Sequence, residues 1–286
     1  MDYAGAVRFT LLPGLELIGN IGQLCADGGI ELSSGIVPGS EQYPALGFAP
    51  QAYVPKLPWR APDEAATGLL SRPTSGHRPG QWLQHFRAPS ALLECFARLR
   101  AASMDQAATL TEEWVQRNCG PALEDAAAYA TTLTQPESGI DSGHVFVRTP
   151  GLPTTAAYPV LVGLHIDTAY SGPVAARRSS PNRLSVNLGC DDRFLLFVNL
   201  DVSQIDDLLK AEGVTYRDEP DVWTHGLRSA FMSRRADYPV IKLRIRPGEA
   251  YLAPTENVIH DGCTTGQRYR DIQYSARGRF HPVRSS

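Results

Sequence analysis

The stretch Pro159-Val-Leu-Val-Gly-Leu-His-Ile-Asp-Thr168 runs an apolar segment directly into a histidine, His165, and a carboxylate, Asp167. In a β-strand, positions i and i+2 point to the same face, so both side chains are predicted to project into one interior. The spacing alone is weak evidence, because a chain with 7 histidines can place one near an aspartate by chance. For this motif by itself, an ordinary hydrogen-bonded pair at a strand end is the better explanation.

A second histidine, His260, closes another apolar segment, Ala253-Pro-Thr-Glu-Asn-Val-Ile-His260. Two imidazoles and one carboxylate on one face of an octahedron form the ligand set that suits Fe(II), and they leave positions open for other ligands. His165, Asp167 and His260 are therefore predicted to bind a metal, and Fe(II) is the metal that this donor set favours.

The segment after His260 enters an alternating stretch that carries two arginines. By the period of two, one face of this predicted strand holds Arg268, Arg270, Ile272, Tyr274 and Ala276. A buried arginine among apolar neighbours needs an anionic partner, because an unpaired charge there is costly. A dicarboxylate that chelates the metal would present its distal carboxylate at this depth, where a guanidinium binds it bidentately. Arg270 is predicted in this role, with Arg268 as a rival.

The periodicity of the chain changes twice. Residues 1–86 are rich in Pro and Gly and are predicted to form short strands and ordered loops. Helical patterns follow at 89–101, 110–117 and 121–131, with Pro121 expected in the first turn of the third helix. Beyond Gly143, polar and apolar residues alternate, which predicts strands at 144–148, 158–165, 183–189, 193–201, 240–246, 250–253, 257–260 and 270–280.

Helices followed by a run of antiparallel strands predict a mainly β (α+β) fold, with a double-stranded β-helix (jelly roll) core buttressed by helices. We expect a single domain over 1–286, with a loop- and strand-rich part at 1–86, helical support at 87–135 and the jelly-roll core with the metal site at 140–281. Ser203 is expected to cap a helix at 204–210, and residues 213–238 are expected to form a long loop.

The order His165-Ile-Asp167, His260 and Arg270 resembles the H-x-D…H…R pattern of the Fe(II)/2-oxoglutarate-dependent oxygenase superfamily. The resemblance covers residues 140–281, and nothing in residues 1–86 resembles a known family. The tail from 260 to 280 is similar to that of the phytanoyl-CoA-hydroxylase-like branch. It departs from that branch in having an aspartate and a glycine after His260, where Gly-Ser is common, and a slightly shorter turn before Arg270.

The resemblance implies that His165, Asp167 and His260 hold Fe(II), that 2-oxoglutarate and O2 are co-substrates, and that Arg270 pairs with the C5 carboxylate. It also implies oxidation of a bound organic substrate by hydroxylation, desaturation or ring closure. Halogenating relatives have a small residue in place of the ligand carboxylate, so Asp167 argues against halogenation.

Weaker candidates lie on the strand predicted at 183–189 and in the long loop. Arg183 and Asn187 share one strand face; facing inward they would bind substrate and co-substrate, and facing outward they are solvent contacts. The two interpretations carry equal weight. Trp223 and His225 lie where a lid over the metal would be expected, and are candidate substrate contacts, although a solvated loop is the ordinary explanation.

Several other charged residues and histidines are expected to have no part in the site. The arginines expected to be solvated are Arg177, Arg178, Arg234, Arg235, Arg277 and Arg279. The histidines without metal-ligand spacing are His77, His85, His144 and His281.

The composition limits the possible partners. A net charge of -3 and a pI near 6.2 predict no binding to nucleic acid or to an anionic membrane. The 5 cysteines lack C-x-x-C spacing, which predicts reduced thiols in a cytoplasmic protein and no structural zinc. Residues 1–23 do not match a signal peptide, and no apolar run is long enough to span a bilayer.

The predicted substrate is a small polar metabolite, such as an amino acid or a specialised-metabolite intermediate, by analogy at the level of the fold. One alternative is a cupin-type jelly-roll metalloprotein that does not use 2-oxoglutarate. Cupins, however, usually place a second histidine at the position of Asp167 and add a nearby glutamate. A second alternative is a non-catalytic β-sandwich binding module, which has no need of both the three ligands and Arg270.

Overall fold

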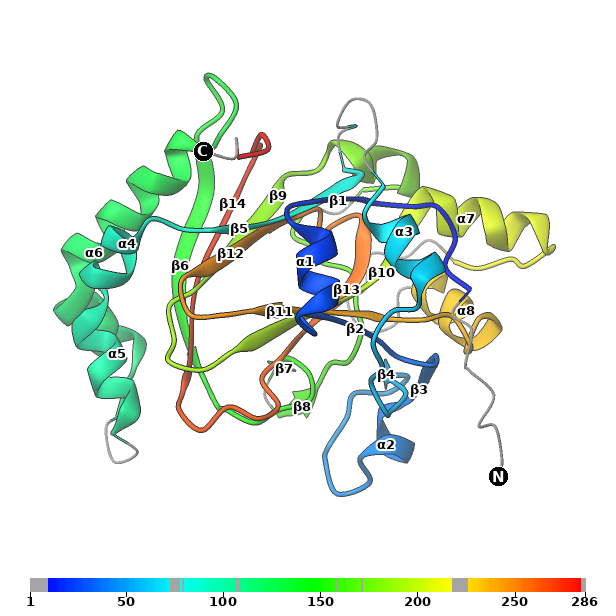
Figure 1. The fold of residues 1–286 in the computed structure, drawn as a ribbon, viewed down its shortest axis with the longest axis horizontal. Coiled ribbons are helices and arrows are strands. Elements are labelled where there is room, and N and C mark those ends of the chain that lie inside the picture. The colour runs from blue at the N-terminus through cyan, green and yellow to red at the C-terminus, as the bar shows by residue number, and fades with distance from the viewer. Residues whose placement is uncertain are drawn as a thin grey trace.

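The computed structural model describes residues 10–72, 78, 80–105, 109–157, 159–170, 172–217 and 226–283. These residues form a mixed fold in which two β-sheets lie in the middle and helices cover their outer faces (Figure 1). Helices α4, α5 and α6 lie on one side of the sheets, and α7 and α8 lie on the other. The mixture of sheets and helices agrees with the expected α+β class.

The larger sheet has 6 strands, and its members are antiparallel except for the first pair. In spatial order they are β1 (Glu16–Ile18), β5 (Trp82–Arg87), β12 (Glu249–Ala253), β9 (Asn182–Asn187), β14 (Asp271–Gly278) and β6 (Ile140–Arg148). The smaller sheet has 4 strands, in the order β13 (Val258–Cys263), β10 (Arg193–Asp201), β11 (Ile241–Ile245) and β2 (Ile30–Leu32).

Alternation along the strands decides which side chains lie between the two sheets. Tyr251 of β12 and Phe197 of β10 share one apolar cluster, so these positions face inward. Leu184 of β9 and Ile272 of β14 pack instead on the helices outside the larger sheet. The inward faces of β9 and β14 are therefore the alternate positions, which are polar.

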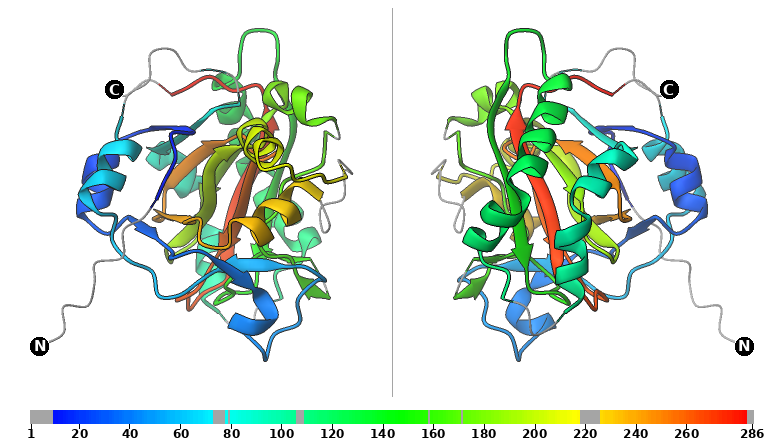
Figure 2. Two further views of the ribbon diagram at one scale, coloured as in Figure 1. Left: turned by 90° about the vertical axis from the view of Figure 1, so that its right-hand side faces the viewer. Right: turned by 90° about the vertical axis from the view of Figure 1, so that its left-hand side faces the viewer.

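The layer outside the larger sheet consists of α4 (Ser90–Cys95), α5 (Ala97–Met104) and α6 (Glu112–Thr132). In the right-hand view of Figure 2 these helices lie in front of that sheet. The prediction that Pro121 begins a helix is wrong, because α6 runs through it. The buried residues of α6 continue on both sides of the proline at helical spacing, so packing on the sheet outweighs the hydrogen bond that Pro121 cannot make. They are Val115, Cys119, Ala122, Ala126 and Ala130.

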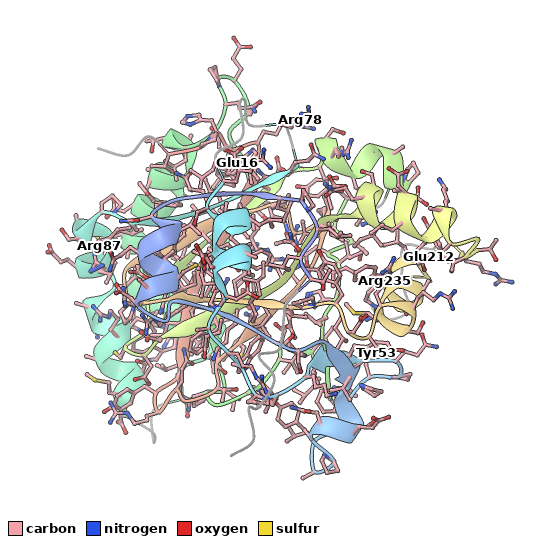
Figure 3. The ribbon with its side chains drawn as sticks, turned by 45° about the vertical axis from the view of Figure 1, so that its right-hand side comes forward. Glu16, Tyr53, Arg78, Arg87, Glu212 and Arg235 are labelled. Carbon is pink, nitrogen blue, oxygen red and sulfur yellow. The ribbon has the colours of Figure 1, made fainter. Side chains whose placement is uncertain are left out.

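The layer outside the smaller sheet consists of α7 (Val202–Ala211), α8 (Gly226–Arg234) and the 3₁₀ helix η1 (Val174–Ser179). Asp201 caps α7, not Ser203 as predicted, because Asp201 and Gln204 form a reciprocal capping box. Helix α8 lies inside the segment predicted as a long loop. Glu212, just after α7, forms an ion pair with Arg235, just after α8, and thereby links the two helices (Figure 3).

The N-terminal part contains short strands, as expected, and also helices that its sequence did not indicate. The helices are α1 (Ile21–Ala26), α2 (Gly39–Gln42) and α3 (Glu64–Leu70). A two-stranded sheet of β3 (Ile36–Pro38) and β4 (Tyr53–Pro55) also belongs to this part. A second two-stranded sheet, of β7 (Ala156–Ala157) and β8 (Val160–Leu161), lies later in the chain. Asp63 begins α3 by accepting a hydrogen bond from Ala66 N. Within the part of the chain that the structure describes, no helix is both long and apolar enough to cross a membrane.

Candidate metal centre

Two separate segments bring the predicted ligands together. His260 lies on β13, and His165 pairs with it through two backbone hydrogen bonds of 2.8 Å each. The strand predicted at 158–165 is shorter than expected, since β8 ends at Leu161 and only this bridge continues it. The chain bends at Gly163, whose φ is +73° and where a Cβ would lie 2.4 Å from Tyr53 O. Glycine is therefore required at this bend.

Hydrogen bonds set the orientation of both imidazole rings. His165 Nδ1 lies 2.8 Å from Gly163 O, and His260 Nδ1 lies 3.1 Å from Val258 O. A carbonyl oxygen only accepts, so Nδ1 carries the proton in each ring and Nε2 carries a lone pair. His260 Nε2 is buried and has no hydrogen-bond partner among the described residues. A buried acceptor of this kind is what a metal ligand requires.

Asp167 completes the cluster. Its Oδ1 lies 3.9 Å from His165 Nε2, and its Oδ2 lies 3.8 Å from His260 Nε2. One ligand atom from each of His165, Asp167 and His260 lies within 4.8 Å of the others, and all three residues are buried. The structure thus brings together all three residues that the sequence predicted as metal ligands. Two neutral nitrogen donors and one carboxylate oxygen fit a divalent transition metal.

Two arginines hold the carboxylate of Asp167. Its Oδ2 lies 2.7 Å from Arg183 Nη2 and accepts a hydrogen bond from Arg277 Nη2 at 3.0 Å. Burial alone would raise the pKa of the Asp167 carboxyl, but the charges of Arg183 and Arg277 hold that pKa below its ordinary value. Asp167 is therefore an ionised donor at neutral pH.

Arg277 was expected at the surface, and that prediction is wrong. Its side chain is only 16% exposed, and it bridges Asp167 to Glu256, whose Oε1 lies 2.7 Å from Arg277 Nη1. It faces inward because it lies directly opposite Arg183 in the register of β14 and β9. The signal that could have found it is the alternation along β14, which places Gln273, Ser275 and Arg277 on one polar face.

The residues predicted to bind the co-substrate lie elsewhere. Arg268 is exposed and Arg270 is half-buried, and both precede β14, which begins only at Asp271. The apolar face that was predicted to continue from them packs on helices α4–α6 and does not line the space between the sheets. Asn187 is buried, and its amide bonds to backbone atoms of Asp191, Ile245 and Gly189.

The space between the sheets also holds a polar group in which Arg193, Asp271 and Gln273 were not predicted from the sequence as site residues, whereas Arg148 was one of the arginines considered for a carboxylate-bearing substrate. Arg193 of β10 lies 3.8 Å from Asp271 of β14, measured from Nε to Oδ1, and both side chains are almost fully buried. Arg148 of β6 donates to Gln273 Oε1 at 3.1 Å, and Gln273 donates to Ser185 Oγ at 2.5 Å. Burial, followed by the nearby charge of Arg193, lowers the pKa of Arg148, while the charge of Asp271 acts in the opposite direction.

Of the remaining residues considered in the sequence, one belongs to the centre and the others do not contact it or fall outside the described part of the chain. Arg183 lies at the centre, whereas Trp223, His225 and His77 fall outside the described residues. His85 pairs with Glu249 at 3.1 Å, and His144 and His281 are exposed. All five cysteines are free thiols.

No protein-family model and no curated protein matches this sequence. Among solved structures, the chain is similar to the epimerase SnoN in complex with Fe3+, alpha ketoglutarate and nogalamycin RO, at 11% identity and a TM-score of 0.39, covering 72% of this chain and 82% of that one. It is also similar to the Kdo hydroxylase KdoO, a non-heme Fe(II) alphaketoglutarate dependent dioxygenase, at 10% identity and a TM-score of 0.41, covering 71% and 80%. Acireductone dioxygenase from Bacillus anthracis with cadmium ion follows at 8% identity and a TM-score of 0.31, covering 71% and 80%.

Proposed function

We propose that this chain is an Fe(II)- and 2-oxoglutarate-dependent oxygenase. The observation that carries the proposal is the convergence of two unprotonated imidazole nitrogens and one ionised carboxylate within 4.8 Å. Two histidines and one carboxylate suit Fe(II) and leave coordination positions free. Bound together, Fe(II) and 2-oxoglutarate supply the activation of O2, and the co-substrate is decarboxylated to succinate.

The strand order supports a jelly-roll interpretation of the core. The larger sheet contains β12-β9-β14-β6, the smaller contains β13-β10-β11, and the bridge from His165 to His260 continues the smaller sheet beside β13. Successive strands beyond β6 thus alternate largely between the two sheets, as they do in a double-stranded β-helix. The closer resemblance to the phytanoyl-CoA-hydroxylase-like branch stays a prediction.

We place the distal carboxylate of 2-oxoglutarate at Arg193 and Arg148 instead of Arg270, Arg268 or Asn187. Arg193 is 3% exposed, and neither its Nε nor its Nη1 has a hydrogen-bond partner among the described residues. A Cβ on Gly262 would lie 3.5 Å from Arg193 Nη2. Gly262 is two residues beyond His260 on the same strand face, about 7 Å along β13. A buried guanidinium with free donors at that distance suits the carboxylate end of a metal-bound dicarboxylate.

The other residues of the centre orient the metal ligands. Arg183 and Arg277 hold Oδ2 of Asp167, which leaves Oδ1 on the side of His165 for the metal. The two guanidiniums also keep Asp167 ionised, so the metal does not have to displace a proton. Arg183 remains a candidate substrate contact because its side chain is partly exposed.

We propose that the substrate is a small polar metabolite, such as an amino acid or a specialised-metabolite intermediate, and that hydroxylation, desaturation or ring closure is the outcome. Halogenation would need a small residue in place of the ligand carboxylate, and Asp167 is present there instead. A cytoplasmic location, with no nucleic acid or membrane as partner, is proposed from the composition.

The test is anaerobic addition of Fe(II) and then 2-oxoglutarate to the purified protein. The expected result is a visible metal-to-ligand charge-transfer band, followed by succinate when O2 is admitted. Absence of both the band and succinate would refute the proposal. Metal binding without the band would favour the cupin-type alternative. Asp167→Ala should abolish both signals, and parent-rate decarboxylation by this variant would remove Asp167 from the ligand set.

A further inference from the structure

Two arginines outside the ligand cluster are the largest fully buried side chains among the described residues. Arg177 on η1 is 1% exposed, and Arg228 on α8 is 0% exposed. Arg177 was expected to be solvated, and that prediction is wrong, whereas its neighbour Arg178 is indeed partly exposed and pairs with Asp201. Taking a guanidinium out of water is costly, so its contacts must compensate for the loss of hydration.

Arg228 contacts the backbone just before the first ligand. Its Nη1 donates to Leu164 O at 3.2 Å, and its Nη2 lies 3.4 Å from Gln51 O. Leu164 immediately precedes His165, and its own N–H bonds to Tyr53 O at 2.8 Å. Arg228 therefore fixes the start of the ligand segment to the segment that contains β4.

Arg177 contacts the other end of the same ligand segment. Its Nη1 donates to Glu256 O at 3.0 Å and lies 3.4 Å from Asp167 O. Asp167 belongs to the first ligand segment, and Glu256 lies four residues before His260 on the second. One guanidinium thus joins the backbones of the two segments that hold all three ligands.

The ligand segment depends on such donors because it is not part of a regular sheet. Among the residues that the structure describes, the bridge at His165 is its one β-pairing with β13, and Asp167 N bonds to Thr255 O at 3.0 Å. Outside a regular ladder, buried carbonyls need other donors, and buried side chains such as those of Arg177 and Arg228 supply them here. A metal site also requires its ligands to be held to within about 0.5 Å.

We propose that Arg177 and Arg228 are positioning residues of the metal centre, which set the separation of His165 and Asp167 from His260. The inference rests on the proposed metal site but not on the choice of co-substrate or substrate. A positioning role differs from a purely structural one in its consequence: it changes the affinity for metal in molecules that remain folded.

The test uses the full chain and Co(II) as the probe, because Co(II) accepts the same donors as Fe(II). Affinity is measured by titration, coordination geometry by the visible Co(II) spectrum, and stability by thermal unfolding. Arg177→Met and Arg228→Met should each weaken Co(II) binding by about 10- to 100-fold, as loss of the residues that orient metal ligands does. Arg177→Lys, which keeps one donor, should recover part of the affinity. Arg228→Lys should not, because one ammonium cannot serve two carbonyls from separate nitrogens.

Leu99→Ala is the matched control, because Leu99 is fully buried in the helical layer, in an apolar cluster that includes no residue of the two ligand segments. It should lower the melting temperature and leave the Co(II) affinity and spectrum unchanged. If the arginine variants behave like Leu99→Ala, the proposal is wrong. If the methionine variants do not fold, Arg228→Lys with parent affinity would equally overturn it. If the parent protein binds no Co(II), the proposed metal centre is wrong. The present inference would then be wrong as well, because it rests on that centre.

Discussion

Replacing Arg193 by methionine tests the interior site most directly. The side chain is buried against Asp271 at 3.8 Å, too far for a hydrogen bond, so its donors remain available to a ligand. Hydrogen bonds to charged groups contribute about 1.5–3 kcal/mol. Losing that contribution should weaken 2-oxoglutarate binding by about 10- to 150-fold.

The same substitution has a second effect that must be separated from the first. It leaves the carboxylate of Asp271, which is 1% exposed, without its ion-pair partner. Breaking a buried pair in this way lowers the free energy of unfolding by about 3–5 kcal/mol. The double variant Arg193→Met/Asp271→Asn removes the lone charge, so stability should recover while affinity for 2-oxoglutarate stays low.

The assay is anaerobic titration of the Fe(II)-loaded protein with 2-oxoglutarate, followed by the charge-transfer band, with urea unfolding in parallel. Arg244→Met is the control, because Arg244 lies on β11 in the same sheet, and the apolar cluster between the sheets contains its neighbours Leu243 and Ile245 instead. Parent affinity in the double variant would refute the reasoning, and so would an equal loss of affinity in Arg244→Met.

Three further predictions concern pH, backbone and packing. Burial lowers the pKa of His260 to about 3, so as the pH falls the unfolded chain takes up a proton before the folded protein does. The metal-free protein should therefore lose stability as the pH falls from about 6.5 towards 3. Urea unfolding at several pH values should show this dependence, and His260→Gln should flatten it. Gly163→Ala should abolish Co(II) binding, since the added Cβ would meet Tyr53 O at 2.4 Å; an unchanged titration would contradict the role given to this bend. Pro121→Ala should raise the free energy of unfolding by about 1–3 kcal/mol, because an N–H for Arg117 O is restored in mid-helix; a lower melting temperature would show that the ring packs favourably.

The sequence predicted the three residues of the candidate metal centre because much of their signal is local. His165 and Asp167 are two positions apart at the end of an apolar run, so strand geometry places them on one face. His260 ends another apolar run, and it was joined to them because two imidazoles and one carboxylate form a known ligand set. Strand β10 was likewise predicted with its observed bounds, Arg193–Asp201, because a short apolar run that includes Phe194, Phe197 and Val198 lies between polar residues. Neither inference required knowledge of what covers the sheets.

Arg193 and Arg148, which we propose as co-substrate contacts, could not be found in this way, because alternation does not say which face is inward. Ile272 and Ala276 of β14 are apolar, and the usual rule would turn them towards the space between the sheets. A helical layer covers the outer face of this sheet, however, so these residues pack there and Gln273 and Arg277 point inward. The prediction for Arg270 followed the apolar face, which in the structure packs on the helical layer.

The space between the sheets is itself divided, and this division explains how the fold tolerates a charged interior. Between β5 and β12 of the larger sheet and the facing strands of the smaller sheet, it is filled by an apolar cluster that includes Leu83, Phe197 and Tyr251. On the inner faces of β9, β14 and β6 it holds the arginines and carboxylates of the centre. The outer faces of β9 and β14 pack on α4–α6, which stabilises these strands. Because the apolar burial that stabilises this half lies outside the sheet, the inward positions are free to hold ligands. Leu99→Ala should therefore change stability, whereas the double variant Arg193→Met/Asp271→Asn should change binding and largely keep stability.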